Sequence, residues 1–301
     1  MINFNDFKKI TLADKPIFDA FYAKYPVVHS DNMFTTMVSW GEYVDYRYLS
    51  IEENIVIMTK LKNGNIQFRA PLGKQNPTLV HEVLKLAVRE GGNIPFVFVD
   101  KNTKEWIHAS FPKLDFFEDR IFFDYVYLSS DLAELTGTAY AAIRNRLNKF
   151  QKNHTYTFEV VTKNNIDEVQ EFLKRWCLWK DCASDELLEN ERKAMAYSMA
   201  HFYELGLSGL AIRINGIIEA IAVFEQMNQN TAVVHYEKGS PDFDGIYKAI
   251  NRETAQLLKD KFQYINRETD MGVPGLRKAK LSYRPHHLVE VFSVEKKNIF
   301  F

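Results

Sequence analysis

The residue types best suited to chemistry gather near the end of the chain, between Tyr264 and Tyr283. An acid or base beside fixed cations is what acyl or phosphoryl transfer requires. Glu268 and Asp270 are the candidate bases of this segment. Its other polar residues are Asn266, Arg267, Arg277, Lys278 and Lys280. The cations are candidates for stabilising a developing negative charge or for holding a phosphate backbone, and an exposed loop with solvated charges is the alternative interpretation.

The composition is that of an ordinary globular chain with room for two cores. Of the 301 residues, 46% are hydrophobic, and domains of about 100–150 residues are typical. No apolar run is long enough to span a bilayer, and the first residues lack the pattern of a secretion signal. Cys177 and Cys182 are too few for a disulfide framework, and their spacing suits neither zinc nor a redox pair. We expect a cytoplasmic, reduced, metal-free protein.

The formal net charge is −1, but the basic residues are unevenly placed. The stretches 138–154 and 271–289 each carry four Lys or Arg residues and no acid. Such patches bind a polyanion even on a neutral protein, or form a solvated helix face and a lysine-rich loop. For Arg144 and Asn145, in the first stretch, we favour a role between two domains, with phosphate binding as the alternative.

The pattern of elements runs through a similar cycle twice. The first half predicts the helices 15–25, 34–40, 79–90 and 104–111 and the strands 43–50, 54–60, 66–70 and 96–99, with one or two strands within 116–128. A basic amphipathic helix, 140–152, is expected to join the halves. The second half predicts the helices 166–180, 185–205 and 244–261 and the strands 156–162, 207–213, 217–224, 231–238, 262–267 and 288–294. Asn215-Gly216, between two apolar runs, predicts a tight hairpin.

The order of elements in the second half resembles the Gcn5-related N-acetyltransferase fold, and the first half looks like a degenerate copy of it. We therefore predict an α/β (α+β) chain of two tandem domains with mixed sheets flanked by helices. The expected boundaries are 1–137 for the first domain, 138–153 for a connecting basic helix, and 154–301 for the domain that carries the site.

Several motifs make the resemblance more specific. They are Tyr140-x3-Arg144-Asn145-x2-Asn148-x-Phe150, Tyr236-Glu237-Lys238, Asp244-Gly245-x-Tyr247-x2-Ile250-Asn251, and the run Ile265-Asn266-Arg267-Glu268-x-Asp270 with its continuation to Tyr283. Over nearly its whole length the chain resembles a bacterial family grouped with the C-terminal domain of phosphatidylglycerol lysyltransferases. Its wider relatives include the Fem-type peptidyltransferases, which move an amino acid from aminoacyl-tRNA to an amine or hydroxyl. The lipid-modifying enzymes also carry a membrane-embedded segment, which these residues do not contain.

The Gcn5-like fold implies that strands 231–238 and 262–267 splay apart and receive the acyl donor. Coenzyme A normally places its pyrophosphate at the start of the next helix. Here Asp242 and Asp244 stand at that point, and each would repel a partly desolvated pyrophosphate by about 1 kcal/mol or more. With Glu237 these acids suit an ammonium group instead, although for Asp244 we favour a plain helix cap.

The leading hypothesis is an acyl or aminoacyl transferase that takes an activated ester such as aminoacyl-tRNA and modifies a small amine, peptide or lipid headgroup. Its bases would be Glu268 and Asp270, with Lys278 and Lys280 as electrostatic groups. The predicted substrate-binding residues are Arg144, Asn145, Tyr236, Glu237, Lys238, Asp242, Asp244, Asn266, Arg267, Arg277 and Tyr283. The alternatives are a coenzyme A-dependent N-acyltransferase and a non-catalytic module that binds an aminoacyl or peptidyl ligand. His235 is predicted to be a hydrogen-bonded core residue.

Overall fold

The computed structural model describes residues 2–300, which form two compact units. Unit 1 comprises the described residues up to Asp124, Thr269–Gly272 and the residues from Val289 onwards. Unit 2 comprises Tyr125–Glu268 and Val273–Leu288. These limits differ from the predicted boundaries, because the residues just after Asp124 join the sheet of unit 2 and the last strand joins the sheet of unit 1.

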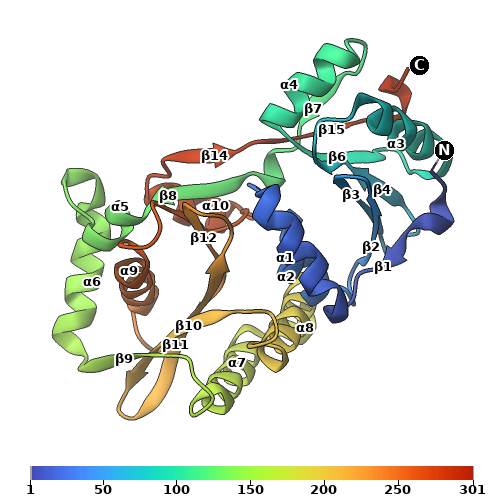
Figure 1. Ribbon diagram of the computed structural model, residues 1–301. Helices are drawn as coiled ribbons and strands as arrows, with labels where there is room; N and C mark the ends of the chain where they lie inside the picture. The colour runs from blue at the N-terminus through green and yellow to red at the C-terminus, as the bar shows by residue number, and fades with distance from the viewer. Residues whose placement is uncertain (1, 301) are drawn as a thin grey trace. The chain divides into compact units, whose positions relative to one another are not determined.

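Unit 1 is built on a mixed sheet in the order β1-β2-β3-β4-β6-β15-β7, with β5 beside β3 (Figure 1). Its strands are β1 (Lys8–Lys9), β2 (Asp45–Ile51), β3 (Asn54–Lys60), β4 (Ile66–Arg69), β5 (Leu72–Gly73), β6 (Phe96–Asp100), β7 (Phe116–Glu118) and β15 (Val291–Val294). Its helices are α1 (Lys15–Lys24), α2 (Phe34–Ser39), α3 (Pro77–Glu90) and α4 (Lys101–Ser110). The apolar face of α3 packs into the core formed with this sheet.

Unit 2 is built on a sheet in the order β14-β8-β13-β12-β11-β10-β9. Its strands are β8 (Asp124–Leu128), β9 (Tyr156–Val160), β10 (Ser208–Ile214), β11 (Ile217–Gln226), β12 (Thr231–Gly239), β13 (Tyr264–Asn266) and β14 (His287–Val289). Its helices are α5 (Ser129–Glu134), α6 (Ala141–Asn153), α7 (Ile166–Lys180), α8 (Glu186–Ala200), α9 (Ile246–Leu258) and α10 (Pro274–Ser282). The predicted fold class is confirmed by this mixed α/β architecture.

The hairpin between β10 and β11 is confirmed at the predicted turn. Asn215 and Gly216 both have positive φ angles, of 51° and 81°, as the favoured two-residue turn requires. The turn sets an antiparallel register that runs from Ile214 opposite Ile217 to Ser208 opposite Phe224. This ladder supports β12, the strand that carries most of the candidate site.

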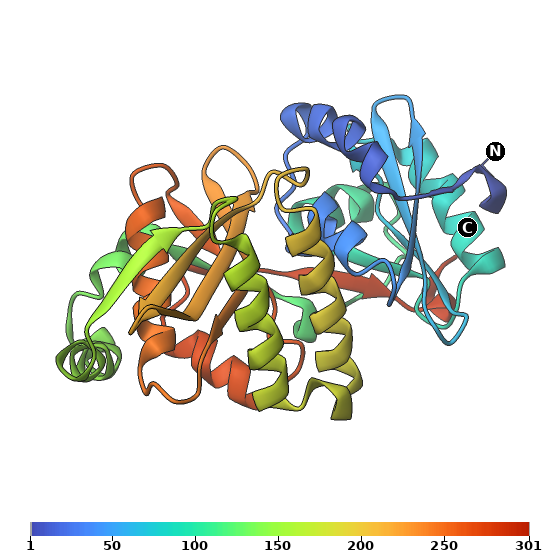
Figure 2. The ribbon, with the colours of Figure 1, turned by 90° about the horizontal axis from the view of Figure 1, so that it is seen from below.

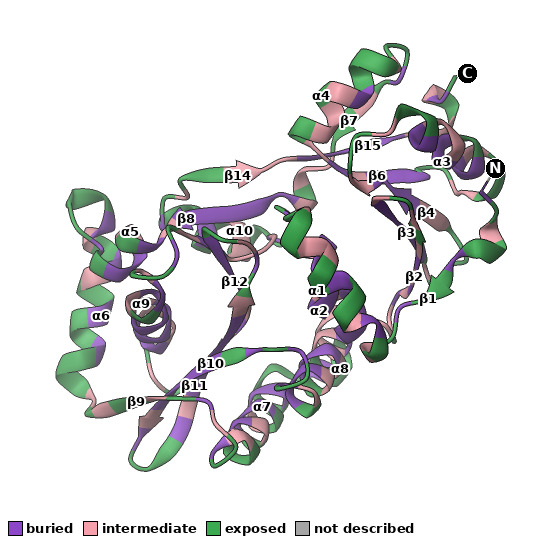
Figure 3. Ribbon diagram, in the orientation of Figure 1, coloured by how far each residue is buried: buried purple, intermediate pink, exposed green. Residues whose placement is uncertain are grey.

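Helices cover both faces of the sheet of unit 2. Tyr236 Oη lies 3.2 Å from Ser198 Oγ of α8, whereas Glu237 accepts a hydrogen bond from Asn251 of α9. Adjacent side chains of a strand point to opposite faces, so α8 and α9 lie on opposite sides of β12. Figure 2 shows α7 and α8 side by side, and Figure 3 shows that α6 keeps one exposed face while β8 is almost wholly buried.

Two segments differ from the predicted elements. The residues 288–294, expected as one strand, form β14 and β15, which belong to different sheets. The segment after Asp270, expected as a loop, contains helix α10, which begins at Pro274. Proline is favoured in the first turn of a helix because its missing N–H would have no partner there, so this proline marks a helix start.

The expectation of reduced cysteines is wrong. Cys177, near the end of α7, and Cys182, just beyond that helix, form a disulfide. It lies beside an apolar groove of about 430 Å³ between α7 and α8, which Leu173, Met195 and Met199 also line. Within residues 2–300 no helix combines the length and hydrophobicity needed to cross a membrane.

Removal of the disulfide with the double variant C177A/C182A is expected to lower the free energy of unfolding by about 2 kcal/mol, the loop-closure contribution of so short a ring. Urea unfolding of the oxidised protein and the variant measures this difference. Reductant should reproduce the loss in the natural sequence and leave the variant unchanged. Equal stability of all three samples would contradict a stabilising role.

Candidate active site in unit 2

The candidate site begins where two parallel strands of unit 2 stop pairing. β12 and β13 pair at only three positions, from Thr231 opposite Tyr264 to Val233 opposite Asn266. Beyond these positions β12 continues to Gly239. The segment that follows β13 turns away from β12 at Glu268, which has a φ of 59°. The predicted divergence of these strands is thus present. Where the backbones no longer pair, charged side chains of the two segments interact across the gap.

The first group in this gap is a histidine held between two carboxylates. His235 Nε2 lies 2.8 Å from Glu225 Oε1 of β11, and His235 Nδ1 lies 2.7 Å from Glu268 Oε1. Burial opposes the charge of this imidazole, whose side chain is only 4% exposed. The two carboxylates outweigh burial and raise the pKa of His235 to about 10. His235 is therefore a fixed cation near neutral pH and donates from both ring nitrogens.

The second group is centred on Glu237. Arg267 Nη2 donates to Glu237 Oε1 over 2.9 Å, and Asn251 Nδ2 donates to Glu237 Oε2 over 3.0 Å. Two buried atoms of this group, Arg267 Nη1 and Asn251 Oδ1, have no hydrogen-bond partner among the described residues. Buried polar atoms are nearly always paired, so this donor and this acceptor are the unusual feature of the site.

Aromatic rings and a lysine surround the Arg267 guanidinium. Its central carbon lies 4.9 Å from the ring centre of Tyr283 and 5.6 Å from that of Tyr127. Lys248 Nζ, from the start of α9, lies 4.5 Å from the same Tyr283 ring. Burial, and next the charge of Arg267, lower the pKa of Lys248 to about 8. A fraction of this amine is consequently neutral at physiological pH, which suits it to accept a proton.

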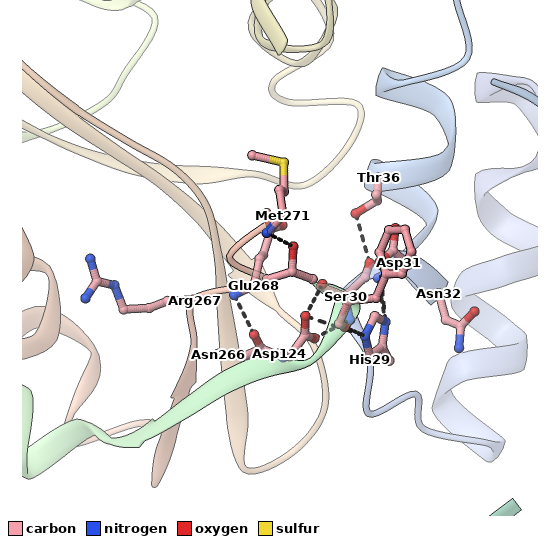
Figure 4. A network of polar contacts seen from close by, with 12 residues as sticks. His29, Ser30, Asp31, Asn32, Thr36, Asp124, Asn266, Arg267, Glu268 and Met271 are labelled. Carbon is pink, nitrogen blue, oxygen red and sulfur yellow. Dashed lines mark hydrogen bonds and ion pairs between the residues drawn. The ribbon is translucent and has the colours of Figure 1, made fainter. Parts of the chain in front are cut away.

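The backbone that carries Arg267 and Glu268 is held by other predicted residues. Asn266 Oδ1 accepts a hydrogen bond of 2.7 Å from the Glu268 N–H, as the close view in Figure 4 shows. Lys280 is buried, and its amine donates to the carbonyl oxygens of Arg267 and Glu268. This placement favours a structural role for Lys280 over the predicted catalytic one. Lys278 is exposed and Arg277 is half-buried on α10.

Asp270 belongs to unit 1, whereas Glu268 belongs to unit 2. Asp270 is fully buried and pairs with Arg120 over 3.4 Å, and it accepts a hydrogen bond from the Gly272 N–H. These contacts are typical of a carboxylate that orders a turn. Of the two predicted bases, Glu268 alone takes part in the charged groups of the gap in unit 2.

Unit 1 has a buried polar cluster of its own, which Figure 4 also draws. Ser30 donates to Asp124 through both its main-chain N–H, over 2.7 Å, and its hydroxyl, over 2.8 Å. His29 Nε2 lies 2.7 Å from the Phe122 carbonyl oxygen. The hydroxyl therefore bonds to the carboxylate and the imidazole to a carbonyl, which is not the arrangement of a nucleophile with its base.

Two residues of the predicted Tyr236-Glu237-Lys238 set point away from the gap. Tyr236 lies against α8, and Lys238 Nζ lies 2.8 Å from Glu191 of that helix and 4.2 Å from the ring centre of Trp176 of α7. Both contacts follow from the alternation of side chains along β12. Glu237 is the member of the set that joins Arg267.

The start of α9 offers little room for a pyrophosphate. Asp244 does not cap the helix as expected, because Gly245 is the N-cap residue and has no side chain. The Asp244 carboxylate instead pairs with Lys149 over 3.3 Å and Arg146 over 3.7 Å. A Cβ atom on Gly245 would lie 2.9 Å from the Arg146 carbonyl oxygen, which shows how closely α6 packs here. Asp242 is exposed on the loop before the helix.

The remaining predicted residues lie on α6. Arg144 donates to the carbonyl oxygens of Leu135 and Gly137, within unit 2. It therefore fixes the loop that precedes α6 and lies apart from the charged groups of the gap in its described contacts. Asn145 is exposed on the same helix.

Four residues of the charged groups are absent from the predicted set: Glu225, His235, Lys248 and Asn251. The sequence predicts a hydrogen-bonded core histidine at position 235, and His235 is indeed buried and hydrogen-bonded, but to two carboxylates. Asn251 belonged to a motif of the resemblance, three positions after Lys248. Since residues three apart lie on one helix face, that motif could have indicated both.

The class of protein follows from the two sheets. Each unit has a mixed sheet flanked by helices, and the second unit has a splayed pair of parallel strands. These features define a chain of tandem Gcn5-related N-acetyltransferase-like domains. The chain belongs to the family described as phosphatidylglycerol lysyltransferase, C-terminal, which matches residues 22–295. The resemblance found in the sequence is thereby confirmed, and aminoacyltransferase-type proteins are its relatives.

Solved structures support this assignment. A conserved protein of unknown function from Bacteroides thetaiotaomicron VPI-5482 is 34% identical, with a TM-score of 0.89 over 96% of this chain and 98% of that one. L-PGS from Bacillus licheniformis is 15% identical, with a TM-score of 0.68 over 98% and 94% of the two chains. FemX is 10% identical, with a TM-score of 0.60 over 95% and 96%. The last two share the fold.

Proposed function

We propose that the chain is an aminoacyl or acyl transferase that works in the gap between β12 and β13. The observation that carries the proposal is the early end of their parallel pairing, beside which His235 meets Glu268 and Glu237 meets Arg267. In this class of fold the same gap receives an activated acyl group. Family membership supports an aminoacyl ester as the donor.

The reaction proposed is attack by an acceptor amine on the carbonyl carbon of an ester. A C–N bond forms, the ester C–O bond breaks, and the leaving alcohol takes up a proton. Glu268 is the proposed base for the proton that the acceptor loses, and His235 orients its carboxylate. Arg267 would stabilise the oxyanion, because a preorganised charge in a water-poor site favours the transition state.

Aminoacyl-tRNA is the donor that the family resemblance favours. Exposed cations of α6, such as Lys152, provide a surface on which a phosphate backbone could lie. Coenzyme A is the weaker candidate, because α6 packs against the start of α9 and Asp242 and Asp244 stand beside it. The acceptor is an amine, a peptide or a lipid headgroup.

The proposal is tested with bulk charged tRNA bearing labelled amino acids. Filter retention is compared for charged tRNA, deacylated tRNA and charged tRNA with excess acetyl-coenzyme A, and transfer of label is followed to amines, peptides and phospholipid vesicles. We expect retention that prefers charged tRNA and that coenzyme A does not displace. Glu268→Gln should retain tRNA and lose about 10²-fold or more in transfer rate, as removal of a general base does.

Glu171→Gln is the matched control, since Glu171 is exposed on α7 and pairs with Lys174. It should transfer at the normal rate. Retention without transfer in the natural sequence would favour the non-catalytic binding module. Displacement of the donor by acetyl-coenzyme A would favour the coenzyme A-dependent N-acyltransferase.

A further inference from the structure

Within residues 2–300 the orders of the two sheets end in the strands β1, β7, β9 and β14, and β9 differs from the other three. β1, β7 and β14 have two or three residues each, and β1 consists of two lysines. Short strands and lysines are usual means by which proteins prevent pairing at a sheet edge. β9 has five residues, none of them lysine or proline, and Figure 2 shows it as the yellow-green arrow at the edge of its sheet. This edge of unit 2 is therefore open to a further strand.

The pairing with β10 shows which main-chain groups of β9 face outwards. The Val161 N–H donates to the Gly209 carbonyl oxygen over 2.8 Å, and bonding positions alternate along an antiparallel pair. The odd-numbered residues of β9 therefore bond to β10. The even-numbered residues direct their N–H and C=O groups away from the sheet, and they are Tyr156, Phe158 and Val160.

The even-numbered residues also carry an apolar face out to the edge. Phe158 lies opposite Ile212 and Val160 lies opposite Leu210, and both residues of β10 belong to the core of unit 2. Phe158 is nevertheless 58% exposed and Val160 is 51% exposed. An exposed apolar face beside outward main-chain donors and acceptors is typical of a strand that pairs with another chain.

We propose that β9 pairs in antiparallel orientation with β9 of a second copy of the chain, with the two Phe158 residues opposite each other. In this register they exchange a pair of main-chain hydrogen bonds, and the Val160 N–H of each copy donates to the Tyr156 carbonyl oxygen of the other. The Val160 carbonyl oxygen already accepts a hydrogen bond of 3.0 Å from Asn165 Nδ2, and the pairing does not depend on it. The inference is independent of the proposed reaction.

The strand is self-complementary in this register, which favours a second copy over an unrelated peptide. The two Phe158 rings meet on the apolar face, and such aromatic pairs stabilise a sheet. On the other face Glu159 of each copy lies opposite Thr157 of the other, and Glu159 is already paired with Arg213 over 2.6 Å. A register displaced by two residues in one direction would oppose the two Glu159 side chains, and the opposite displacement would leave Val160 beyond the other strand.

The test is sedimentation equilibrium of the full chain from about 1 to about 200 μM. Because a single short strand pair buries less than a standard interface, we expect a reversible dimer with a dissociation constant on the order of 10–100 μM. Phe158→Glu and Phe158→Lys should each weaken the dimer at least about 10-fold, because like charges then face each other. An equal mixture of the two variants should associate at least about 10-fold more tightly than either variant alone, since opposite charges then meet.

Leu257→Lys is the matched control, because Leu257 is 47% exposed on α9 and does not belong to the edge strand. It should dimerise within about twofold of the natural sequence. Association restored in the mixture would also show that both Phe158 variants fold. A natural chain that stays monomeric over the whole range, a dimer that Phe158→Glu leaves unchanged, or a mixture that associates no better than its components would each overturn the pairing. None of these outcomes depends on transfer from charged tRNA.

Discussion

Arg267→Ala is expected to lower the free energy of unfolding by about 3–5 kcal/mol and to abolish transfer. The stability loss follows from burial, because the Glu237 carboxylate would lose its cationic partner in a poorly solvated site. Removal of one partner of a buried ion pair costs far more than the pair itself contributes. Urea unfolding at neutral pH measures the first effect, and the charged-tRNA assay measures the second.

A double variant separates stability from function. R267M/E237Q removes both charges and still offers a carbonyl oxygen to Asn251 Nδ2, so most of the lost stability should return. Transfer should not return, because the donor to the substrate carbonyl is still missing. Recovery of transfer together with stability would show that Arg267 acts only on the fold.

Arg213→Ala provides the comparison for an ion pair in a more exposed setting. Arg213 bonds to Glu159 and Glu168 at the surface of unit 2. Its removal should cost about 0–1 kcal/mol, the usual range for such pairs. A loss as large as that of Arg267→Ala would contradict the view that burial makes the Glu237 group special.

The elements that place the site could be predicted because local patterns determine them. The Asn215-Gly216 turn and the apolar runs beside it specify the β10–β11 register, and β12 follows in the same antiparallel order. Divergence from β13 came from the resemblance, since no local pattern states where a parallel pair stops. The path of the last strand could not be foreseen, because β14 and β15 are separated by one residue yet join different sheets.

Side-chain direction limited the prediction of the site. Tyr236 and Lys238 flank Glu237 in the sequence but point to the opposite face of β12, where α8 lies. Lys280 turns back to main-chain carbonyls because the expected loop is the helix α10. The pKa of His235 is raised by Glu225 and Glu268, which lie on other segments of the chain. The chemistry of this site therefore depends on pairings that no local sequence pattern reports.

His235→Gln is expected to destabilise the protein in a manner that depends strongly on pH. Because the folded-state pKa of His235 is raised from 6.5 to about 10, its charge stabilises the fold fully below about pH 6.5. That contribution, on the order of a few kcal/mol, is lost as the pH rises towards 10. The variant should therefore differ most from the natural sequence at pH 6 and least at pH 10, as measured by urea unfolding at each pH.

His201→Gln tests whether the effect is specific. His201 lies 2.8 Å from Glu204 near the end of α8, where both side chains reach solvent, so its variant should change stability by less than about 0.5 kcal/mol.

The raised pKa of His235 also bears on catalysis, because a histidine that stays charged between pH 6 and 8 cannot serve as the base there. Titration of His235 should therefore cause no rise in the transfer rate near pH 6.5. The pH profiles of the natural sequence and of His235→Gln should have the same shape in that range. A stability difference that stays constant from pH 6 to 10 would show that His235 is not the fixed cation that orients Glu268.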